Sequence, residues 1–243
     1  MARQPRKRLR PGDVKAVVFD AYGTVINCTE PDFIATMAEI CADQSLDADA
    51  NEIWRRFLRA SYFMRAEHHH DPVYQRYDEA WARQFKRVFK QLHLDGDVWR
   101  ASMLFKSALA DAPAFDEARP AIEAIGRHYK VALLSNADDD FLTSCLHRNG
   151  LHFKHVLSSE QARAIKPNPA IFLKMARRLR LPPEDILYAG DNPIHDVLGP
   201  ARAGMRTAWV NRNSYRKPRS VPFPDVRVKS LSELVSMLVP DLD

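Results

Sequence analysis

The sequence feature that most constrains the fold is an apolar run, residues 17–20 (VVFD), that ends on a carboxylate and then turns through Gly23. Such a run predicts a buried strand over 15–20. Side chains at the carboxyl ends of strands in an open parallel sheet face the ligand crevice. Asp20 is therefore a candidate nucleophile. Taken alone, it has a second interpretation, as an aspartate that caps a turn or a helix.

From residue 112 onward, strand and helix patterns alternate. The sequence predicts strands over 131–134, 155–157, 186–189 and 207–210, and helices over 120–128, 138–149, 169–179, 194–203 and 230–238. Strands that alternate with helices predict an α/β fold with a parallel sheet and right-handed crossovers. The stretch 212–224, with three prolines, is predicted to be a loop.

Between the first strand and this alternating block, residues 30–107 carry a helical pattern and no strand pattern. Apolar stripes at helical spacing occupy 33–41, 54–62 and 77–89. The sequence therefore predicts a helical domain over 29–111, inserted into a core made of 13–28 and 112–243. The insertion also contains 68–71 (HHHD), for which we expect a surface or substrate-facing role, because adjacent histidines on a helix do not share one face.

Composition narrows the kind of protein. The chain has 243 residues, 46% of them hydrophobic, which is enough for a large core. The formal charge of +5 resides in five basic residues of the first ten. We expect 1–12 to be a disordered basic tail. We do not expect a nucleic-acid partner, because the tail has no aromatic residue for base stacking. The predicted molecule is cytoplasmic, a monomer or homodimer, with free cysteines and no membrane partner.

Polar side chains follow four of the predicted strands. They are Asp20, the pair Ser135 and Asn136, Lys166, and Asp191 with Asp196 five residues later. Carboxylates after the first and fourth strands offer the oxygen ligands that Mg²⁺ prefers. The Ser135 hydroxyl, a main-chain donor at Asn136 and the Lys166 ammonium are groups that can stabilise negative charge on a transferring group. Each residue alone could be a cap, a turn or a solvated lysine, but their joint order and spacing favour a catalytic site.

At these residues the chain resembles the haloacid dehalogenase (HAD) superfamily. The four motifs of that superfamily are matched by Asp20-x-x-Gly23-Thr24, Ser135-Asn136, Lys166-Pro167 and Gly190-Asp191-x-x-x-x-Asp196. The resemblance covers nearly the whole chain. It implies a Rossmann-like core with the active site under a helical cap.

The resemblance also implies a role for each matched residue. Asp20 would be the nucleophile and Thr24 would orient it, while Ser135 and Asn136 would bind phosphoryl oxygens. Lys166 would steady the charge of the nucleophile and the phosphoryl group. Mg²⁺ would be ligated by Asp20, Asp191 and the main-chain carbonyl of Tyr22. Asp196 would not ligate the metal but would support Asp191 and Lys166.

Tyr22 departs from the phosphatase pattern. Phosphatases of the superfamily usually carry a second aspartate at this position, which protonates the leaving alkoxide and then activates water. A general acid typically contributes about 10²–10⁴-fold, so esters with poor leaving groups should turn over slowly. With Tyr22 beside the substrate, we expect a Mg²⁺-dependent hydrolase of small phosphorylated metabolites that works through an aspartyl phosphate.

Two alternatives remain open. Metal-independent 2-haloacid dehalogenases of the superfamily carry the same Asp-x-Tyr-Gly-Thr run and act through an aspartyl ester, from which halide leaves without a proton. The fourth motif of those dehalogenases resembles Ser-Ser-Asn, whereas residues 190–192 here are Gly-Asp-Asn. The dehalogenases also carry a halide-binding arginine and, after the third-motif lysine, a tyrosine. In this chain the acidic stretch 47–51 and Phe172 occupy those two places. A non-catalytic scaffold on the same fold is supported only by Tyr22, because the other catalytic positions are filled.

Overall fold

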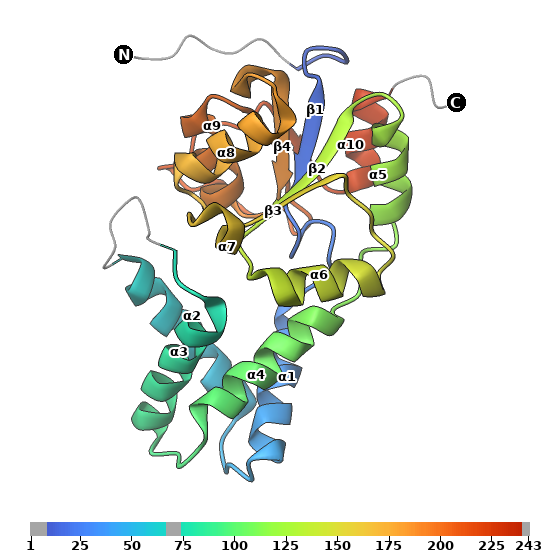
Figure 1. Cartoon of the computed structure of the whole chain (residues 1–243). Helices are drawn as coiled ribbons and strands as arrows, with labels where there is room; N and C mark the ends of the chain where they lie inside the picture. The colour runs from blue at the N-terminus through green and yellow to red at the C-terminus, as the bar shows by residue number, and fades with distance from the viewer. Residues whose placement is uncertain (1–8, 67–73, 240–243) are drawn as a thin grey trace.

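Every residue of β1 (Ala16–Phe19) is buried, as the apolar run at the start of the sequence predicts. The computed structural model describes residues 9–66 and 74–239, and in it β1 lies inside a six-stranded parallel sheet (Figure 1). The α/β fold predicted from the alternating patterns is confirmed. The remaining strands are β2 (Lys130–Ser135), β3 (His155–Ser158), β4 (Ile186–Gly190), β5 (Arg206–Val210) and β6 (Val226–Val228).

The strand order is β3-β2-β1-β4-β5-β6. The chain moves outward from β1 to β3, then returns to the other side of β1 and moves outward again to β6. The direction therefore reverses beside β1, whose two neighbours are β2 and β4. Ligands of such sheets bind at the carboxyl ends of the strands beside the reversal, so the topology determines where the site lies.

Helices cover both faces of the sheet (Figure 1). One face carries α5 (Ala118–Gly126) and α10 (Leu231–Leu238), and the other carries α8 (Pro169–Leu179) and α9 (Gly199–Ala203). Successive side chains of β1 enter these two apolar layers alternately, as the period of a strand requires. A further helix, α6 (Asp139–Arg148), lies between the core and the inserted helices.

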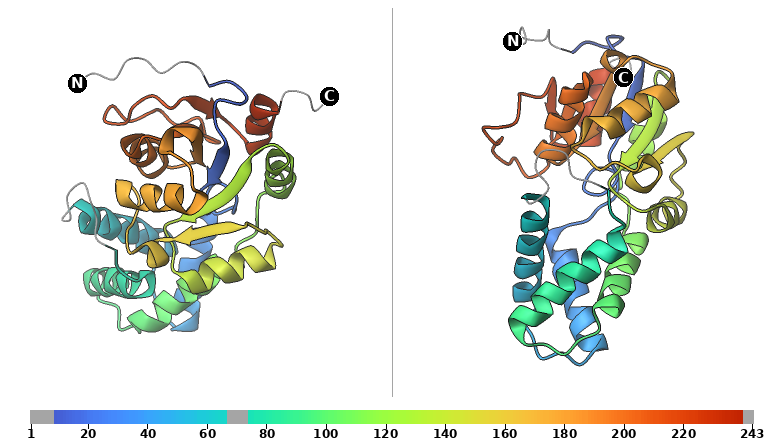
Figure 2. Two further views of the ribbon diagram at one scale, coloured as in Figure 1. Left: turned by 45° about the horizontal axis from the view of Figure 1, so that its top comes forward. Right: turned by 60° about the vertical axis from the view of Figure 1, so that its left-hand side comes forward.

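The insertion after β1 is helical, as predicted, and forms a cap (Figure 2). Its aromatic stripes meet in one interior, where the ring centroid of Phe57 lies 4.7 Å from that of Phe85 and 5.2 Å from that of Phe105. These rings form the apolar interior of the cap, which is continuous with the core layer that contains Phe19 and Phe141. The helices of the cap are α1 (Glu30–Asp43), α2 (Ala50–Ala66), α3 (Tyr77–Leu92) and α4 (Val98–Asp111).

Two linkers join the cap to the core, and they run side by side. The amide of Asn27 donates to the carbonyl of Pro113 over 2.7 Å, and Ile26 forms an antiparallel bridge with Ala114. The side chain of Asn149, at the end of α6, accepts a hydrogen bond from the Ala114 amide over 2.6 Å. The two covalent connections between cap and core thus lie side by side.

The helix predicted over 194–203 is split in two. Its first part is a π-helical turn, η2 (Pro193–Leu198), and its second part is α9. Pro200 has no N–H to donate to the carbonyl of Asp196, four residues earlier, so regular α-helical hydrogen bonding cannot run through the segment. The irregular turn carries Asp196, one of the predicted site residues.

Other differences from the predictions are short or terminal. Residues 9–12 do not belong to a disordered tail, because Leu9 is buried and the Gly12 amide donates to the Tyr129 hydroxyl. The cluster 68–71 lies outside the described residues. None of the described helices combines the length and apolar character that crossing a bilayer requires. Three elements too short for a periodic pattern were not predicted: α7 (Ser159–Ala162), η1 (Pro183–Asp185) and β6.

The aromatic interior should make a large contribution to the stability of the cap. Phe85 is fully buried, whereas Trp99 is 54% exposed. We expect Phe85→Ala to lower the free energy of unfolding by about 3–5 kcal/mol, because it leaves a cavity. Trp99→Ala should lower it by less than about 1 kcal/mol. Urea denaturation followed by circular dichroism measures both, and equal losses would contradict this account of the cap.

Candidate active site

Three strand ends meet beside the central strand. Asp20 follows β1, Ser135 ends β2 and Asp191 follows β4, and both neighbouring strands pair directly with β1. Lys166 enters from the segment between α7 and α8. The structure therefore brings together residues from all four motifs that the sequence singled out.

Lys166 lies at the centre of the site. Its ammonium is 2.6 Å from Asp20 Oδ1, 2.7 Å from Asp196 Oδ1 and 3.0 Å from the hydroxyl of Tyr188. An ammonium has three N–H donors, so each of them has an acceptor here. Burial works to lower the pKa of Lys166, but the two carboxylates outweigh burial and raise this pKa well above its usual value. Lys166 is therefore a permanent cation at neutral pH.

Tyr188 is a site residue that the sequence analysis missed. Its hydroxyl donates to the carbonyl of Leu134 over 2.9 Å and accepts from Lys166. Because the single hydroxyl proton goes to Leu134, the oxygen is left to accept from the lysine. The signal for Tyr188 was available in the sequence, since a hydroxyl inside a fully buried strand needs a hydrogen-bond partner.

The carboxylates of Asp20, Asp191 and Asp196 form one cluster, in which one oxygen of each residue lies within 4.8 Å of the others. Burial raises the pKa of Asp191, and the charges of Asp196 and Asp20 raise it further. Burial also raises the pKa of Asp196, against the opposing effect of Lys166. Only Lys166 is paired with these three acids among the described basic residues. The cluster is therefore short of positive charge.

Two predicted residues make contacts different from those expected. Thr24 is predicted to orient Asp20, but its hydroxyl instead donates to Asp191 Oδ1 over 3.4 Å. The side chain of Asn136 accepts from the Lys166 amide over 2.7 Å and donates to the Lys166 carbonyl over 3.2 Å. Ser135 Oγ does lie beside Asp20, 3.3 Å from Oδ1. Thr24 and Asn136 thus position other site residues.

Glycines allow the backbone to approach the carboxylates. Gly23 has a φ of +89°, and a Cβ at this position would lie 2.7 Å from Asp191 Cγ. A Cβ on Gly190 would lie 2.4 Å from Asp196 Cγ. Both distances are far below ordinary contact, so a side chain at either position would displace an aspartate. Gly23 also takes a backbone conformation that other residues rarely adopt.

The side chain of Tyr22 lies at the seam between core and cap. Its ring centroid is 5.9 Å from that of Phe141 on α6. Its hydroxyl is buried, makes no hydrogen bond of standard geometry among the described residues, and lies near the Cys145 thiol. Burial raises the pKa of Tyr22 well above its usual range, and the nearby Cys145 thiol adds to the rise. The hydroxyl therefore makes no described hydrogen bond to Asp20, and its place beside a substrate stays a prediction.

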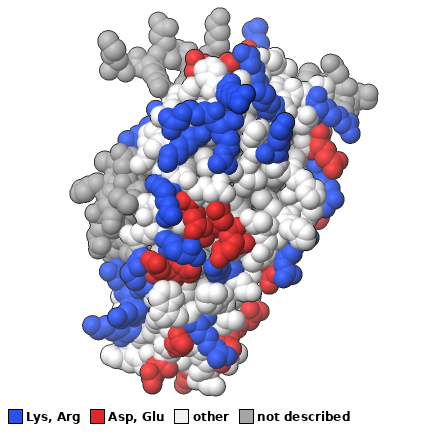
Figure 3. All heavy atoms as spheres, in the orientation of Figure 1, with Lys and Arg blue, Asp and Glu red and all other residues white. Residues whose placement is uncertain are grey.

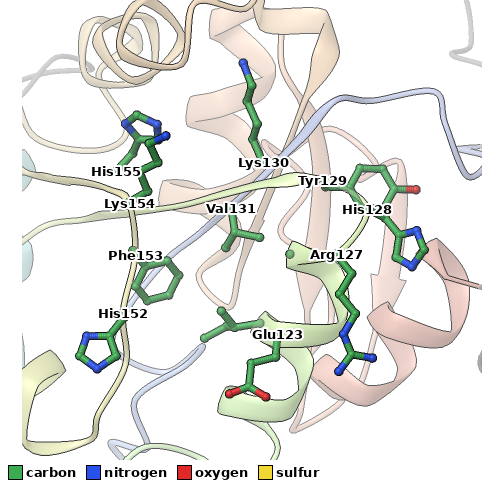
Figure 4. A pocket seen from close by; sticks show the side chains of 12 residues that line it. Glu123, Arg127, His128, Tyr129, Lys130, Val131, His152, Phe153, Lys154 and His155 are labelled. Atoms are coloured by element: carbon green, nitrogen blue, oxygen red, sulfur yellow. The ribbon is translucent and has the colours of Figure 1, made fainter.

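A cavity of about 580 Å³ lies away from these residues (Figure 4). It is lined by the end of α5 and by the starts of β2 and β3, with Arg127, Lys130 and Lys154 among its side chains. These are the amino ends of the strands, on the opposite edge of the sheet from Asp20. The cavity contains none of the predicted site residues.

A comparison with protein families agrees with the geometry. The family model for haloacid dehalogenase-like hydrolases matches residues 14–204, a range that contains every predicted site residue. The chain belongs to the haloacid dehalogenase-like hydrolases. The resemblance drawn from the four motifs is thereby confirmed, and so is the assignment of the protein to the HAD hydrolases.

Individual relatives differ in how much of the chain they match. Haloacetate dehalogenase H-2 from Moraxella sp. (strain B) is 26% identical over 93% of this chain and 98% of its own. A phosphoserine phosphatase from Thermus thermophilus is 34% identical, but over 64% of this chain and 66% of its own. The HAD hydrolase YfnB from Bacillus subtilis, solved bound to magnesium, has the same fold, with a TM-score of 0.80 at 19% identity over 93% and 98% of the two chains.

Because Gly190 lies so close to Asp196, we expect one added methyl group at this position to lower the stability of the protein markedly. Gly190→Ala should force Asp196 away from Lys166 and lower the free energy of unfolding by about 1–3 kcal/mol. Gly126→Ala is the matched control, because its Cβ would come no nearer than 3.6 Å to a neighbouring atom. The control should change stability by less than about 1 kcal/mol. Equal effects in urea denaturation would show that the cluster adapts freely.

The unpartnered hydroxyl of Tyr22 predicts that Tyr22→Phe is harmless. Removing a buried hydroxyl without a partner should leave the free energy of unfolding unchanged or raise it by about 1–2 kcal/mol. The hydrolytic rate should stay within about two-fold, since the general-acid contribution would be far larger. Urea denaturation and steady-state kinetics check both expectations. A rate loss of about ten-fold or more would mean that the hydroxyl reaches the substrate during turnover.

Proposed function

We propose that this HAD hydrolase is a Mg²⁺-dependent phosphohydrolase of small phosphate esters, with Asp20 forming an aspartyl-phosphate intermediate. The observation that carries the proposal is the cluster of Asp20, Asp191 and Asp196, two of them buried, beside a single lysine among the described residues. Family membership alone does not choose the substrate, because one fold supports different chemistries. The residues of the site therefore carry more weight here than overall similarity.

The residues of the cluster fit a magnesium ion. The carboxylates of Asp20 and Asp191 and the main-chain carbonyl of Tyr22 would hold it, with Asp196 behind them. Three carboxylates beside one ammonium leave two negative charges when all are ionised, which is the charge that a divalent cation balances. When bound, Mg²⁺ would offset negative charge on the phosphoryl oxygens. The magnesium bound by YfnB supports the same fit.

The protein side chains account for the remaining chemistry. The Asp20 carboxylate attacks phosphorus, the ester P–O bond breaks, and the alkoxide leaves. Lys166 balances the negative charge of the transition state, and Ser135 donates to a phosphoryl oxygen. Water then attacks the phosphorus of the aspartyl phosphate, which releases inorganic phosphate and restores Asp20.

The substitution at Tyr22 limits the substrates. No carboxylic acid stands at this position to protonate a departing alkoxide, and the tyrosine hydroxyl is buried at the seam. Esters whose alcohol leaves readily as an anion, such as aryl phosphates, should therefore be the better substrates.

2-Haloacid dehalogenation is the second candidate, and the relatives favour it. Haloacetate dehalogenase H-2 matches 93% of the chain, whereas the phosphoserine phosphatase matches 64% of it. Asp20 would displace halide from carbon and water would hydrolyse the resulting ester, so neither a metal nor a leaving-group acid is needed. This reaction leaves Asp191 unexplained, because none of the described basic residues forms an ion pair with this half-buried carboxylate.

One set of assays separates the candidates. We expect release of p-nitrophenol from p-nitrophenyl phosphate with Mg²⁺ but not with a chelator, and no chloride from 2-chloropropionate. Asp20→Asn should abolish the reaction. Asp191→Asn should lower it by about 100-fold or more and remove the rise in melting temperature that Mg²⁺ causes in the wild type.

Asp95→Asn is the control, because it makes the same charge change at an exposed position of the cap. It should leave both the rate and the effect of Mg²⁺ unchanged. Chloride release that is unchanged by the chelator and by Asp191→Asn would overturn the proposal in favour of dehalogenation. Absence of both reactions would favour the non-catalytic scaffold.

A further inference from the structure

Charged side chains crowd the seam between the cap and the core (Figure 3). Arg76 of the cap pairs with Glu160 of the core over 2.8 Å, and Lys106 of the cap pairs with Asp140 of the core. Both acids lie close in the chain to site residues, since Asp140 is the second residue of α6, shortly after Asn136, and Glu160 lies in α7, shortly before Lys166. The seam is therefore built on the segments that follow β2 and β3.

Asp138 is the fully buried acid of this seam. Its Oδ1 accepts from the hydroxyl of Tyr74 over 2.9 Å, and its Oδ2 accepts from the amide of Tyr77 over 2.7 Å. Tyr77 is the first residue of α3, and Arg76, at the N-cap position, makes no side-chain capping bond. Asp138 thus caps a helix of the other domain, where a carboxylate is favourable.

The helix to which Asp138 belongs by sequence is capped by a different residue. Asp138 occupies the N-cap position of α6 but makes no capping bond there. Glu160 supplies the carboxylate instead, because its Oε2 accepts from the Asp139 amide over 2.8 Å while its Oε1 pairs with Arg76. The carboxylate of Asp138 is therefore left for the cap.

The loop that carries Asp138 also carries Ser135 and Asn136. Between them, the Ala137 amide donates to Ser159 Oγ over 3.0 Å, and the same hydroxyl donates to the Ala137 carbonyl over 2.9 Å. This loop is consequently fixed to the core on its inner side. Its outer side is held to the cap by Asp138.

We propose that Asp138 is a positioning residue, which holds Tyr74 and the start of α3 on the Ser135–Asn136 loop so that the cap covers the occupied site. The inference rests on the proposed function, in which this loop binds the substrate. Closure over a site excludes water from a reactive intermediate. Burial raises the pKa of Asp138, and the hydrogen bonds from Tyr77 and Tyr74 oppose this rise by stabilising the charged carboxylate.

The test compares Asp138→Ala and Asp138→Asn with Asp139→Asn, whose carboxylate contacts only Gln161 among the described side chains. Hydrogen exchange of the Tyr77 amide should speed up by about ten-fold or more in Asp138→Ala, because a hydrogen bond to a charged group is lost. It should rise less in Asp138→Asn, whose amide oxygen still accepts a bond. It should not change in Asp139→Asn.

Kinetics separate positioning from a purely structural role. For p-nitrophenyl phosphate with Mg²⁺, KM should rise by about ten-fold in Asp138→Ala. Partial unfolding would instead lower the maximal rate and leave KM unchanged. Tyr74→Phe removes one donor without a change of charge or fold, and should raise KM by a smaller factor.

Two results would overturn the inference: an unchanged Tyr77 exchange rate in Asp138→Ala, or an unchanged KM in both Asp138→Ala and Tyr74→Phe. The exchange measurement needs no substrate. It therefore tests the contact even if the wild type fails to hydrolyse p-nitrophenyl phosphate, an outcome that would count against the proposed function alone. If chloride is released from 2-chloropropionate instead, KM for that substrate serves in its place.

Discussion

The candidate site depends on one ammonium group. Lys166 donates its three N–H bonds to Asp20, Asp196 and Tyr188 in a buried environment. Charges taken out of water cost several kcal/mol each unless they are paired and hydrogen-bonded, so the two carboxylates could not lie together without this cation. Asn136 holds the backbone of the lysine in turn. The direction of the Asp20 carboxylate is therefore set by residues from four separate segments.

The charge balance around Lys166 bears on the choice between the two candidate reactions. Asp191 brings a third carboxylate to a cluster with one lysine, and this surplus of negative charge suits a site that works with a divalent cation. Tyr22 and the full-length similarity to haloacetate dehalogenase point to displacement of halide at carbon instead. Both candidate reactions would use Asp20 as the nucleophile, and the side chains next to it would decide which bond is broken.

The cap adds a second level of control. Paired linkers connect it to the core, and the ion pairs described between Arg76 and Glu160 and between Lys106 and Asp140 lie on the segments that follow β2 and β3. Phe141 of α6 contributes an apolar part of this seam, with its ring against those of Tyr22 and Trp81. Cap position and the geometry of the Ser135 loop are thus mechanically linked.

The sequence by itself determined the α/β alternation, the helical insertion and the four motif positions, because strand and helix periods and residues at strand ends are local properties of the chain. It could not determine the partners of Thr24, of Asn136 or of the Tyr22 hydroxyl, nor the π-helical turn under Asp196. Only the tertiary structure decided these, and it alone showed Tyr188 beneath Lys166 and Asp138 capping α3. The physical reason is that hydrogen-bond partners and burial depend on which distant segments meet, and the order of strands in the sheet decides that.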